Sequence, residues 1–500
     1  MLRSALFAPI QREGKKDEAS HSAYYFNKMG YTSAIGAGLY THLPLGHILF
    51  NNVKNILNEE LEKHAECSFH EFPGVAPEAL WQESGRLELF GNSIFRYRDQ
   101  HGKKMILAPT HEVTAAKTAA QHIRSYKELP VRISQIQNKF RDETRPRAGV
   151  IRSRQFQMHD LYSFDINKES AELGYQKVKR AYEETFRRLC IPALPVAQTD
   201  MGAIGGDGSH EFHCPAEIGD DTVVDYAGET KPSLELAHIF MLGTDYSEAL
   251  NAYYVDRNNK KIPIYMCSFG MGIERTAAAY IECNIKRNHK AQELIWSWNL
   301  SPFQIMILGD TPFCFEMYLN QKAKGRRCLL DDRDLGFGQK LAQGFQLGFP
   351  IYLVQGPKDS AQSIQLVCRP LGIDMTISTS DIKETVEVVI DQLRAHEAVA
   401  CYGTPIAIEP SQQVIFGQFK SLASMNVAIG ARHDISPSKM GNFGEPKPAQ
   451  QVRGKCGKYW LNPIVASDIS KPEMMLQDDL KYLAWPKKQT PSLKQMKGFW

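Results

Sequence analysis

The sequence predicts an α+β fold in the first part of the chain, followed by an α/β domain and a C-terminal extension. Residues 128–165 alternate polar and apolar residues over two strand-length stretches around a turn, which favours a long antiparallel hairpin. Helical segments are expected before and after this hairpin. After residue 298, short apolar strands alternate with helices. We therefore expect an antiparallel-sheet domain over 1–298, an α/β domain over 299–398 and an extension over 399–500.

Length and composition set the general class. Five hundred residues exceed what one hydrophobic core usually organises. The chain is 43% hydrophobic and 23% charged, which is typical of a globular protein and argues against wholesale disorder. The net charge of +3 says little by itself, although basic residues outnumber acidic ones in the extension. Any general attraction to a polyanion is therefore expected there and in local patches.

The ten cysteines include no Cys-x-x-Cys pair, so neither a disulfide framework nor a structural zinc site is expected. The first residues lack the apolar segment and cleavage site of a signal peptide, and they contain acidic residues, which transit peptides avoid. No apolar run is long enough to span a bilayer. We expect a cytoplasmic protein without a membrane segment.

Individual elements follow in order along the chain. Turn residues around Pro44 and Gly46 precede apolar residues at helical spacing, which predicts one long amphipathic helix and then a short strand ending at Pro73. After the hairpin we expect a charged helix, a glycine-rich loop, and a strand that breaks at glycines into a helix, over 168–189, 199–212 and 267–283. The α/β domain has expected strands over 303–310, 326–332, 350–356 and 363–369, and helices over 315–324, 338–348 and 380–398.

The hairpin carries the first candidate binding residues. Arg141 and Glu143 are two positions apart, so on a strand they would share a face. A guanidinium on a rigid sheet is suited to bind a phosphate or a carboxylate through two hydrogen bonds. One face of the return strand presents groups typical of a small-molecule pocket, namely Phe156, Met158, Asp160 and Tyr162. A solvated hairpin with ordinary surface arginines is the alternative.

Two further segments add polar groups. APTHEVTAAK places Thr110 and Glu112 directly after an apolar strand, and such a hydroxyl and carboxylate can hold an ammonium or imino group. In SFGMGIER the glycines let the backbone approach a ligand closely, and Arg275 begins a helix. Each segment is weak support by itself.

Together, these segments resemble a known family. A long helix with a terminal proline, the FRDE hairpin, and the GMGIER strand and helix occur in the order of the three signature motifs of class II aminoacyl-tRNA synthetases. The stretches GLYTHLPLG, LWQESGR, APTHE, GAIGGDGSHEF and LGTDYSEA are similar to prolyl-tRNA synthetases of the bacterial and mitochondrial type. The resemblance extends from residue 1 to about residue 395. It implies activation of L-proline with ATP and Mg²⁺, and transfer to tRNA(Pro).

The resemblance also implies residue roles. Arg141 would be the catalytic arginine that contacts the amino-acid carboxylate and the α-phosphate, and Arg275 would be the second, holding the γ-phosphate of a bent ATP. Glu235 would help to hold Mg²⁺. The implied ATP-binding residues are Arg141, Glu143, Phe156, Glu235, His238 and Arg275. The implied proline-binding residues are Thr110, Glu112, Arg141, Met158, Asp160, Tyr162, His210 and Ser268.

The α/β domain, over LLDDRDLGFGQKLAQGFQLGFPIYLVQG, is similar to the anticodon-binding domain of prolyl-, threonyl-, histidyl- and glycyl-type synthetases. Asp332, Arg333 and Lys340 would meet the anticodon stem-loop, whose unpaired bases can be read by hydrogen bonds and stacking. Ordinary solvated side chains are the alternative. Class II synthetases use the long helix and the following strand at a twofold interface, so the resemblance also implies a homodimer.

The sequence departs from the family in several places. Typical bacterial members insert an editing domain between motifs 2 and 3, whereas the link over 216–233 is too short to hold one, so we expect no editing in cis. The extension over 399–500 matches no family segment and could bind tRNA or a partner, or pack as a passive cap. Four positions carry unusual residues, none of them a charged residue of the mechanism: Gln155, Ala237, Met241 and Ser268.

Two other functions remain open. A catalytically lapsed paralogue could bind tRNA in a regulatory role, but it would be expected to lose the arginines that bind ATP, and Arg141 and Arg275 are present. An enzyme that charges a carrier protein would not need an anticodon-binding domain. The sequence therefore favours an active proline–tRNA ligase.

Overall fold

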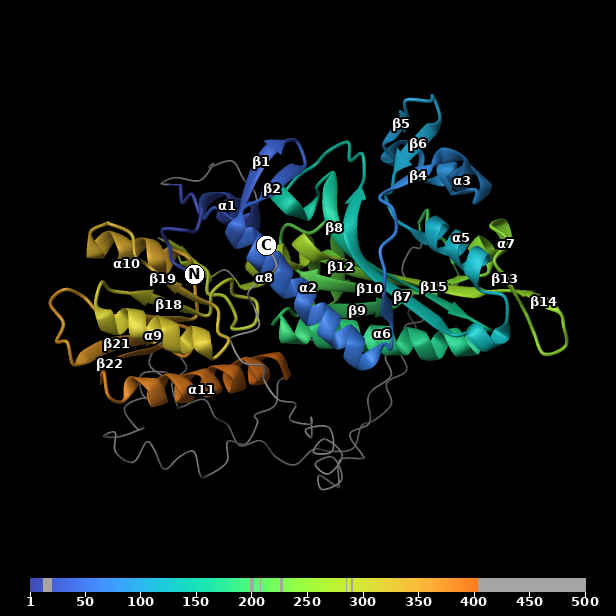
Figure 1. Ribbon diagram of the computed structural model, residues 1–500. Coiled ribbons are helices and arrows are strands. Elements are labelled where there is room, and N and C mark those ends of the chain that lie inside the picture. The colour runs from blue at the N-terminus through green and yellow to red at the C-terminus, as the bar shows by residue number, and fades with distance from the viewer. Residues whose placement is uncertain are drawn as a thin grey trace, which may run out of the picture. The chain divides into compact units, whose positions relative to one another are not determined.

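The computed structural model describes residues 1–11, 20–197, 202–206, 208–224, 228–284, 286–288 and 291–402 (Figure 1). The last described helix is α11 (Ile382–Tyr402), so nearly all of the extension predicted over 399–500 lies outside the described residues. None of the helices in these ranges combines the length and the apolar character needed to cross a membrane.

An eight-stranded sheet forms the centre of the first part of the chain (Figure 1). Its order is β3-β7-β8-β15-β12-β10-β9, with β11 paired to β12. All pairs are antiparallel except β3 with β7, and this confirms the predicted α+β class. The strands are β3 (Ser68–Phe69), β7 (Val131–Phe140), β8 (Gln155–Asp165), β9 (Leu194–Ala197), β10 (Gly208–Pro215), β11 (Asp221–Val224), β12 (Thr230–Gly243) and β15 (Tyr265–Gly272).

Long helices cover one face of this sheet. The helix α6 (Lys168–Arg188) packs on β8, β12 and β15, while α2 (Pro44–His64) packs along α6, and α8 (Ile273–Asn284) packs on β8 and β12. The predicted long amphipathic helix is α2, whose buried side chains include Leu49 and Val53. At Gly46 a Cβ atom would lie 2.2 Å from the carbonyl oxygen of Tyr31, so only glycine allows this close approach.

Smaller elements pack toward the other face, around an apolar cluster that includes Trp81, Tyr162 and Phe240. The helices here are α3 (Glu78–Glu83), α4 (Arg86–Phe90), α5 (Glu112–His122) and α7 (Asp245–Ala249). The strands β4 (Val75–Pro77), β5 (Arg96–Arg98) and β6 (Lys104–Leu107) form a three-stranded sheet. The other elements of the first part are α1 (His21–Lys28), β1 (Thr32–Gly36), β2 (Leu39–His42), β13 (Tyr253–Val255), β14 (Lys261–Pro263), β16 (Lys286–Asn288) and β17 (Ala291–Glu293).

The predicted hairpin is confirmed as β7 and β8, whose register runs from Val131 opposite Phe164 to Phe140 opposite Gln155. The strand is shorter than expected, however, and Arg141 and Glu143 lie beyond its end. The Asp142 amide donates to the Ser93 carbonyl instead of continuing the ladder. The prediction that Arg141 and Glu143 share a strand face was therefore wrong, because β7 ends at Phe140 and the Glu143 amide donates to the Arg141 carbonyl in a tight turn.

The later part of the chain contains a five-stranded mixed sheet in the order β19-β18-β20-β21-β22. Parallel pairs join β18 to β19 and β20, and antiparallel pairs join the others. The four predicted strands are present, but sequence reasoning missed β22, an edge strand with mostly exposed or half-buried residues. The elements are β18 (Ile305–Leu308), α9 (Pro312–Ala323), β19 (Cys328–Leu330), α10 (Phe337–Gln346), β20 (Ile351–Val354), β21 (Ser363–Cys368) and β22 (Ile373–Ser378). The domain boundaries near residues 298 and 398 stay a prediction.

Candidate active site

A cavity of about 540 Å³ opens on the face of the central sheet opposite the long helices. Its walls come from β8, β12 and β15, from the loop after β7, and from the first residues of α5 and α8. The structure brings most of the predicted site residues together here: Thr110, Glu112, Arg141, Glu143, Phe156, Met158, Asp160, Glu235, His238, Ser268 and Arg275.

One end of the cavity is built around the buried carboxylate of Glu112. The Thr110 hydroxyl donates to one of its oxygens at 2.6 Å, and the Ser268 hydroxyl donates to the other at 2.8 Å. Burial raises the pKa of Glu112, while these two hydrogen bonds act in the opposite direction. Glu112 also begins α5, where a helix favours negative charge. This end therefore holds a carboxylate supported only by neutral donors, which suits a substrate cation.

A second buried carboxylate, Asp160, lies nearby but has a charged partner. Its Oδ1 atom is 2.6 Å from Nζ of Lys139, a residue that sequence reasoning missed. Burial acts to raise the pKa of Asp160, but Lys139, His111 and the hydrogen bonds to it together lower that pKa. Asp160 is therefore ionised and paired within the protein.

The remaining predicted residues of β8 have different positions. Phe156 and Met158 face the cavity, as expected for alternate residues of a strand. Tyr162 shares their face but does not line the cavity, because it belongs to the apolar cluster behind the wall. Its hydroxyl donates to Asp160 at 2.9 Å. Tyr162 therefore supports the cavity wall, and the expected direct contact with a ligand is a correction.

Arg141 lies where the two ends of the cavity meet. Its Nε donates to the carbonyl of Pro109 at 3.3 Å, and its guanidinium carbon is 5.3 Å from the centre of the Phe156 ring. Burial and the charge of Arg275 lower the pKa of Arg141, whereas Glu235 and Glu112 act to raise it. A guanidinium held between carboxylates in this way is suited to bind an anion that enters the cavity.

The other end of the cavity is more exposed and carries opposite charges. Arg275 donates from Nε to the Ile151 carbonyl and from one terminal nitrogen to the Glu235 carbonyl, both at 3.0 Å. Burial by itself would raise the pKa of Glu235, but His238, Arg275 and Arg141 bring it to about 2. Glu235 is therefore an anion throughout the physiological pH range.

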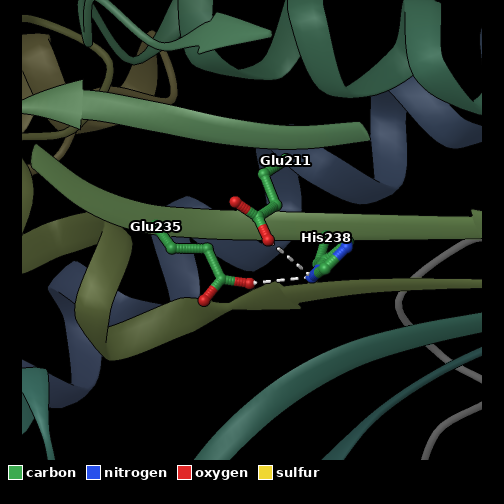
Figure 2. Close-up of side chains that lie close together, drawn as sticks. All are labelled: Glu211, Glu235 and His238. Carbon is green, nitrogen blue, oxygen red and sulfur yellow. Dashed lines mark ion pairs between the residues drawn. The ribbon is translucent and has the colours of Figure 1, made fainter. Parts of the chain in front are cut away.

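Glu235 forms a cluster with two neighbours (Figure 2). The Nδ1 atom of His238 lies 3.2 Å from a Glu235 oxygen and 3.3 Å from a Glu211 oxygen, and Figure 2 shows both carboxylates directed toward the imidazole. Mg²⁺ takes oxygen ligands and usually binds through one or two carboxylates together with substrate phosphates. Glu211 and Glu235 fit that ion, while His238 fits better as the group that orients them.

Glu211 was missed by sequence reasoning, which chose its neighbour His210. The structure contradicts that choice, because His210 does not line the cavity. Its Nδ1 atom lies 2.8 Å from the hydroxyl of Tyr175 on α6, on the helix-covered face of the sheet. Successive residues of a strand point to opposite faces, so an error of one position exchanges a residue of the helix-covered face for a residue of the site.

Glu274 is another cavity residue that sequence reasoning missed, although it precedes Arg275 in the quoted GMGIER motif. One of its oxygens accepts a hydrogen bond from the Gln157 amide at 2.9 Å, and the other lies 3.5 Å from His42. Burial raises the pKa of Glu274 to about 7. A carboxyl group in the wall of the cavity therefore titrates near neutral pH.

The arginine-rich loop of the hairpin is held by one carboxylate from the short link between β10 and β12. Asp220 forms ion pairs with Arg147 and Arg152, which lie on the two arms of the loop. The preceding residue, Gly219, approaches β12 so closely that a Cβ atom would lie 2.0 Å from the Ser233 carbonyl oxygen. The described residues at the start of the link therefore pack closely on β12 and contact the hairpin loop directly.

The predicted anticodon residues are engaged within the protein. Asp332 accepts hydrogen bonds from the amide and hydroxyl of Ser4, and Arg333 forms an ion pair with Asp331. Lys340 lies 2.6 Å from Asp310, and its side chain is only 2% exposed. Direct contact of Lys340 with another molecule therefore disagrees with its burial, whereas Asp332 and Arg333 remain candidates at the surface.

Comparisons with known proteins extend these observations. Residues 95–284 match the family described as tRNA synthetase class II core domain (G, H, P, S and T). A proline–tRNA ligase of Rickettsia bellii is 35% identical over 408 residues, which cover 73% of this chain and 93% of that protein. A proline–tRNA ligase of Sulfurimonas denitrificans is 31% identical and is covered over its whole length, against 78% of this chain.

Solved structures show the same fold. A prolyl-tRNA synthetase of Cryptosporidium parvum in complex with L-proline and AMP superposes with a TM-score of 0.65, at 17% sequence identity, over 78% of this chain and 80% of the other. At that identity the likeness concerns the fold alone, and the curated relatives supply the family. On this sequence similarity, the chain belongs to the prolyl-tRNA synthetase family of class II aminoacyl-tRNA synthetases.

Proposed function

We propose that the cavity carries out both half-reactions of a proline–tRNA ligase: L-proline and ATP form prolyl-adenylate and pyrophosphate, and the prolyl group is then transferred to the 3′ end of tRNA(Pro) with release of AMP. The observation that carries this proposal is the position of Arg141. It lies between a buried end with one unpaired carboxylate, Glu112, and a more exposed end with Arg275 and Glu235. A reaction between an amino acid and a nucleotide requires these two ends in one cavity.

In the bound complex, the ammonium group of proline pairs with Glu112, and Thr110 and Ser268 fix the orientation of that carboxylate. Met158 supplies an apolar wall for the pyrrolidine ring. Arg141 binds the carboxylate of proline and the α-phosphate of ATP, which brings the two reacting groups together. At the other end, Phe156 and Glu143 contact the adenine, His238 supports the same site, and Arg275 binds the γ-phosphate.

A carboxylate oxygen of proline then attacks the α-phosphorus, and pyrophosphate leaves in line. Arg141 stabilises the negative charge that increases on the phosphoryl oxygens. Positioning and charge stabilisation account for this step without a protein nucleophile. Glu235 and Glu211 would hold Mg²⁺ together with ATP, and the ion would supply further neutralisation of the phosphate charge.

The second half-reaction places the 3′-terminal ribose of tRNA at the same α-phosphate end. Arg145, Arg147, Arg152 and Arg154 lie on or near the hairpin loop, where the acceptor end would approach. The α/β domain would bind the anticodon stem-loop through the surface around Asp332 and Arg333. We further propose a cytoplasmic homodimer that uses α2 and β3 at the twofold interface. Sedimentation as a monomer at micromolar concentration would contradict the dimer.

The decisive experiment is proline-dependent exchange of pyrophosphate into ATP, followed by charging of purified tRNA. We expect both activities. Exchange without tRNA charging would favour transfer to a carrier protein, and no exchange above background would favour a catalytically lapsed paralogue. Alanine is the informative competitor, because an apolar pocket discriminates against a missing methylene by only about 1–3 kcal/mol. Mischarged alanyl-tRNA should therefore form and persist in the absence of other factors.

A further inference from the structure

Beneath the amino-acid end of the cavity lies a lysine to which no role has been assigned above. The side chain of Lys139 on β7 is completely buried, and its residue is paired with Phe156 in the sheet, so the two side chains share the cavity face. A buried ammonium group is costly unless it is paired and hydrogen-bonded. The partners of Lys139 therefore show how its buried charge is stabilised.

Lys139 has two partners, an anion and a neutral imidazole. Its Nζ atom is 2.6 Å from Asp160 Oδ1 and 2.6 Å from His111 Nδ1. The Nε2 atom of His111 lies 3.1 Å from the Pro73 carbonyl oxygen, which can only accept, so Nε2 carries the hydrogen atom. Nδ1 is then an acceptor for Lys139. Burial, followed by the charge of Lys139, lowers the pKa of His111 to about 4, so the imidazole stays neutral.

Asp160 has several partners within the protein. Its Oδ2 atom accepts from Gln135, which lies opposite in the sheet, at 2.7 Å and from Tyr162 at 2.9 Å. The amide of His111 donates to the Tyr162 oxygen, which leaves the hydroxyl hydrogen for Asp160. With Lys139 Nζ 2.6 Å from Oδ1, the negative charge of the carboxylate is neutralised by a buried cation.

Asp160 and Glu112 differ in whether a cation compensates their charge. Glu112 accepts only from two hydroxyl groups, so its negative charge is not compensated by these contacts. The two carboxylates and Lys139 together carry a net charge of −1. A secondary ammonium group carries +1. The amino-acid end therefore matches one cation, although two carboxylates belong to its wall.

We propose that Lys139 is a positioning residue that sets the charge of the amino-acid pocket: it neutralises Asp160 from beneath and leaves Glu112 as the one carboxylate available to the substrate ammonium. The inference rests on the proposed function. It predicts that Lys139 affects recognition of the amino acid and has little effect on recognition of ATP.

The test compares Lys139→Met with the double variant Lys139→Met/Asp160→Asn in proline-dependent pyrophosphate exchange. The single variant leaves two uncompensated carboxylates side by side, and we expect KM for proline to rise at least tenfold while KM for ATP changes less than twofold. The double variant removes both charges of the pair and restores the net charge of −1. We expect its KM for proline to return to within about threefold of wild type. Lys177→Met, which removes a surface lysine paired with Glu66, is the matched control and should leave both KM values unchanged.

The outcomes separate the two proposals. Absence of exchange in the wild-type chain would overturn the proposed function, whereas wild-type exchange combined with an unchanged KM for proline in Lys139→Met would overturn the role of Lys139. An equal rise of both KM values would assign Lys139 a merely structural role and would also overturn the proposal. If the single variant fails to fold, the double variant decides, because a folded double variant with a KM for proline still raised tenfold contradicts charge balance.

Discussion

The two ends of the cavity differ in how they hold charge. At the amino-acid end, Glu112 and Asp160 are each 2% exposed and are fixed by hydrogen bonds of defined geometry. At the nucleotide end, the side chains of Glu235 and Arg275 are 34% and 33% exposed, and that of Arg152 is 41% exposed. Charges in a buried site interact strongly and are costly when unpaired, whereas exposed charges are screened by water and salt. The comparison suggests that the buried end selects the amino acid and the exposed end attracts a polyanion.

The largest expected effect lies at the boundary between the two ends. Arg141→Ala removes the group proposed to contact both substrates, and the loss of one such donor typically lowers kcat by about 10²–10³. We expect a fall of this size in proline-dependent exchange, measured at saturating proline and ATP. The matched control is Arg98→Ala on β5, which removes an exposed arginine bonded to the Gly102 carbonyl and should leave exchange unchanged. Undiminished exchange activity in Arg141→Ala would contradict the proposal that Arg141 contacts both substrates.

The next effect concerns the buried end alone. Glu112→Gln keeps the shape of the side chain but removes the charge offered to the substrate. Because a hydrogen bond to a charged group contributes about 1.5–3 kcal/mol, KM for proline should rise about 10–100-fold. Burial raises the pKa of Glu112, so the ionised group destabilises the free protein, and Tm of the variant should increase. A fall in Tm together with an unchanged KM would contradict this view of the buried end.

A pH effect is expected from Glu274. Its pKa is about 7 in the folded protein and 4.5 as the reference value, so the folded state binds more protons between these values. The free energy of unfolding should therefore fall as pH rises from about 4.5 to 7, by roughly 3 kcal/mol at most. Glu274→Gln removes this dependence, and thermal unfolding at pH 5 and pH 8 measures it. If wild type and variant show parallel pH profiles, Glu274 does not titrate in that range.

The smallest effect belongs to the exposed end. Asp220→Asn breaks the ion pairs with Arg147 and Arg152, and exposed pairs contribute only about 0.2–1 kcal/mol. Trypsin should cleave the hairpin loop after these arginines about two to five times faster in the variant. The difference in cleavage rate between variant and wild type should disappear in roughly 0.5 M salt, because screening weakens the ion pairs of the wild type. A difference that persists at high salt would mean that Asp220 holds the loop by packing.

Much of the fold was readable from local patterns. The long helix α2 has apolar residues at helical spacing, and β18 and β20 of the α/β part are short apolar runs that are buried at every residue. The misses were of a different kind. The resemblance implied His210 as a proline-binding residue, but its neighbour Glu211 is the one that faces the cavity. Neighbouring strand residues point to opposite faces, and without the register of β10 against β12 the sequence does not say which of the two faces the cavity.

The candidate site divides in the same way. The residues of APTHE, FRDE and GMGIER lie in short motifs whose chemistry is visible in the sequence, and the cavity contains members of all three. Lys139 and Asp220 are invisible to such reasoning, because each acts through a partner distant in the chain. In the sequence alone, Lys139 is one polar residue of a predicted strand, and Asp220 is one acidic residue of a short link.

The sequence by itself determined the class of fold, the family and the residue types that can bind an amino acid and a nucleotide, since periodicity and short motifs are local properties. Only the tertiary structure decided which charges are compensated. Glu112 and Asp160 are both carboxylates in polar segments, yet one is held by neutral hydroxyl groups and the other by a buried lysine. The energy of a charge in a protein depends on its burial and on its neighbours in space, and both are set by the tertiary structure.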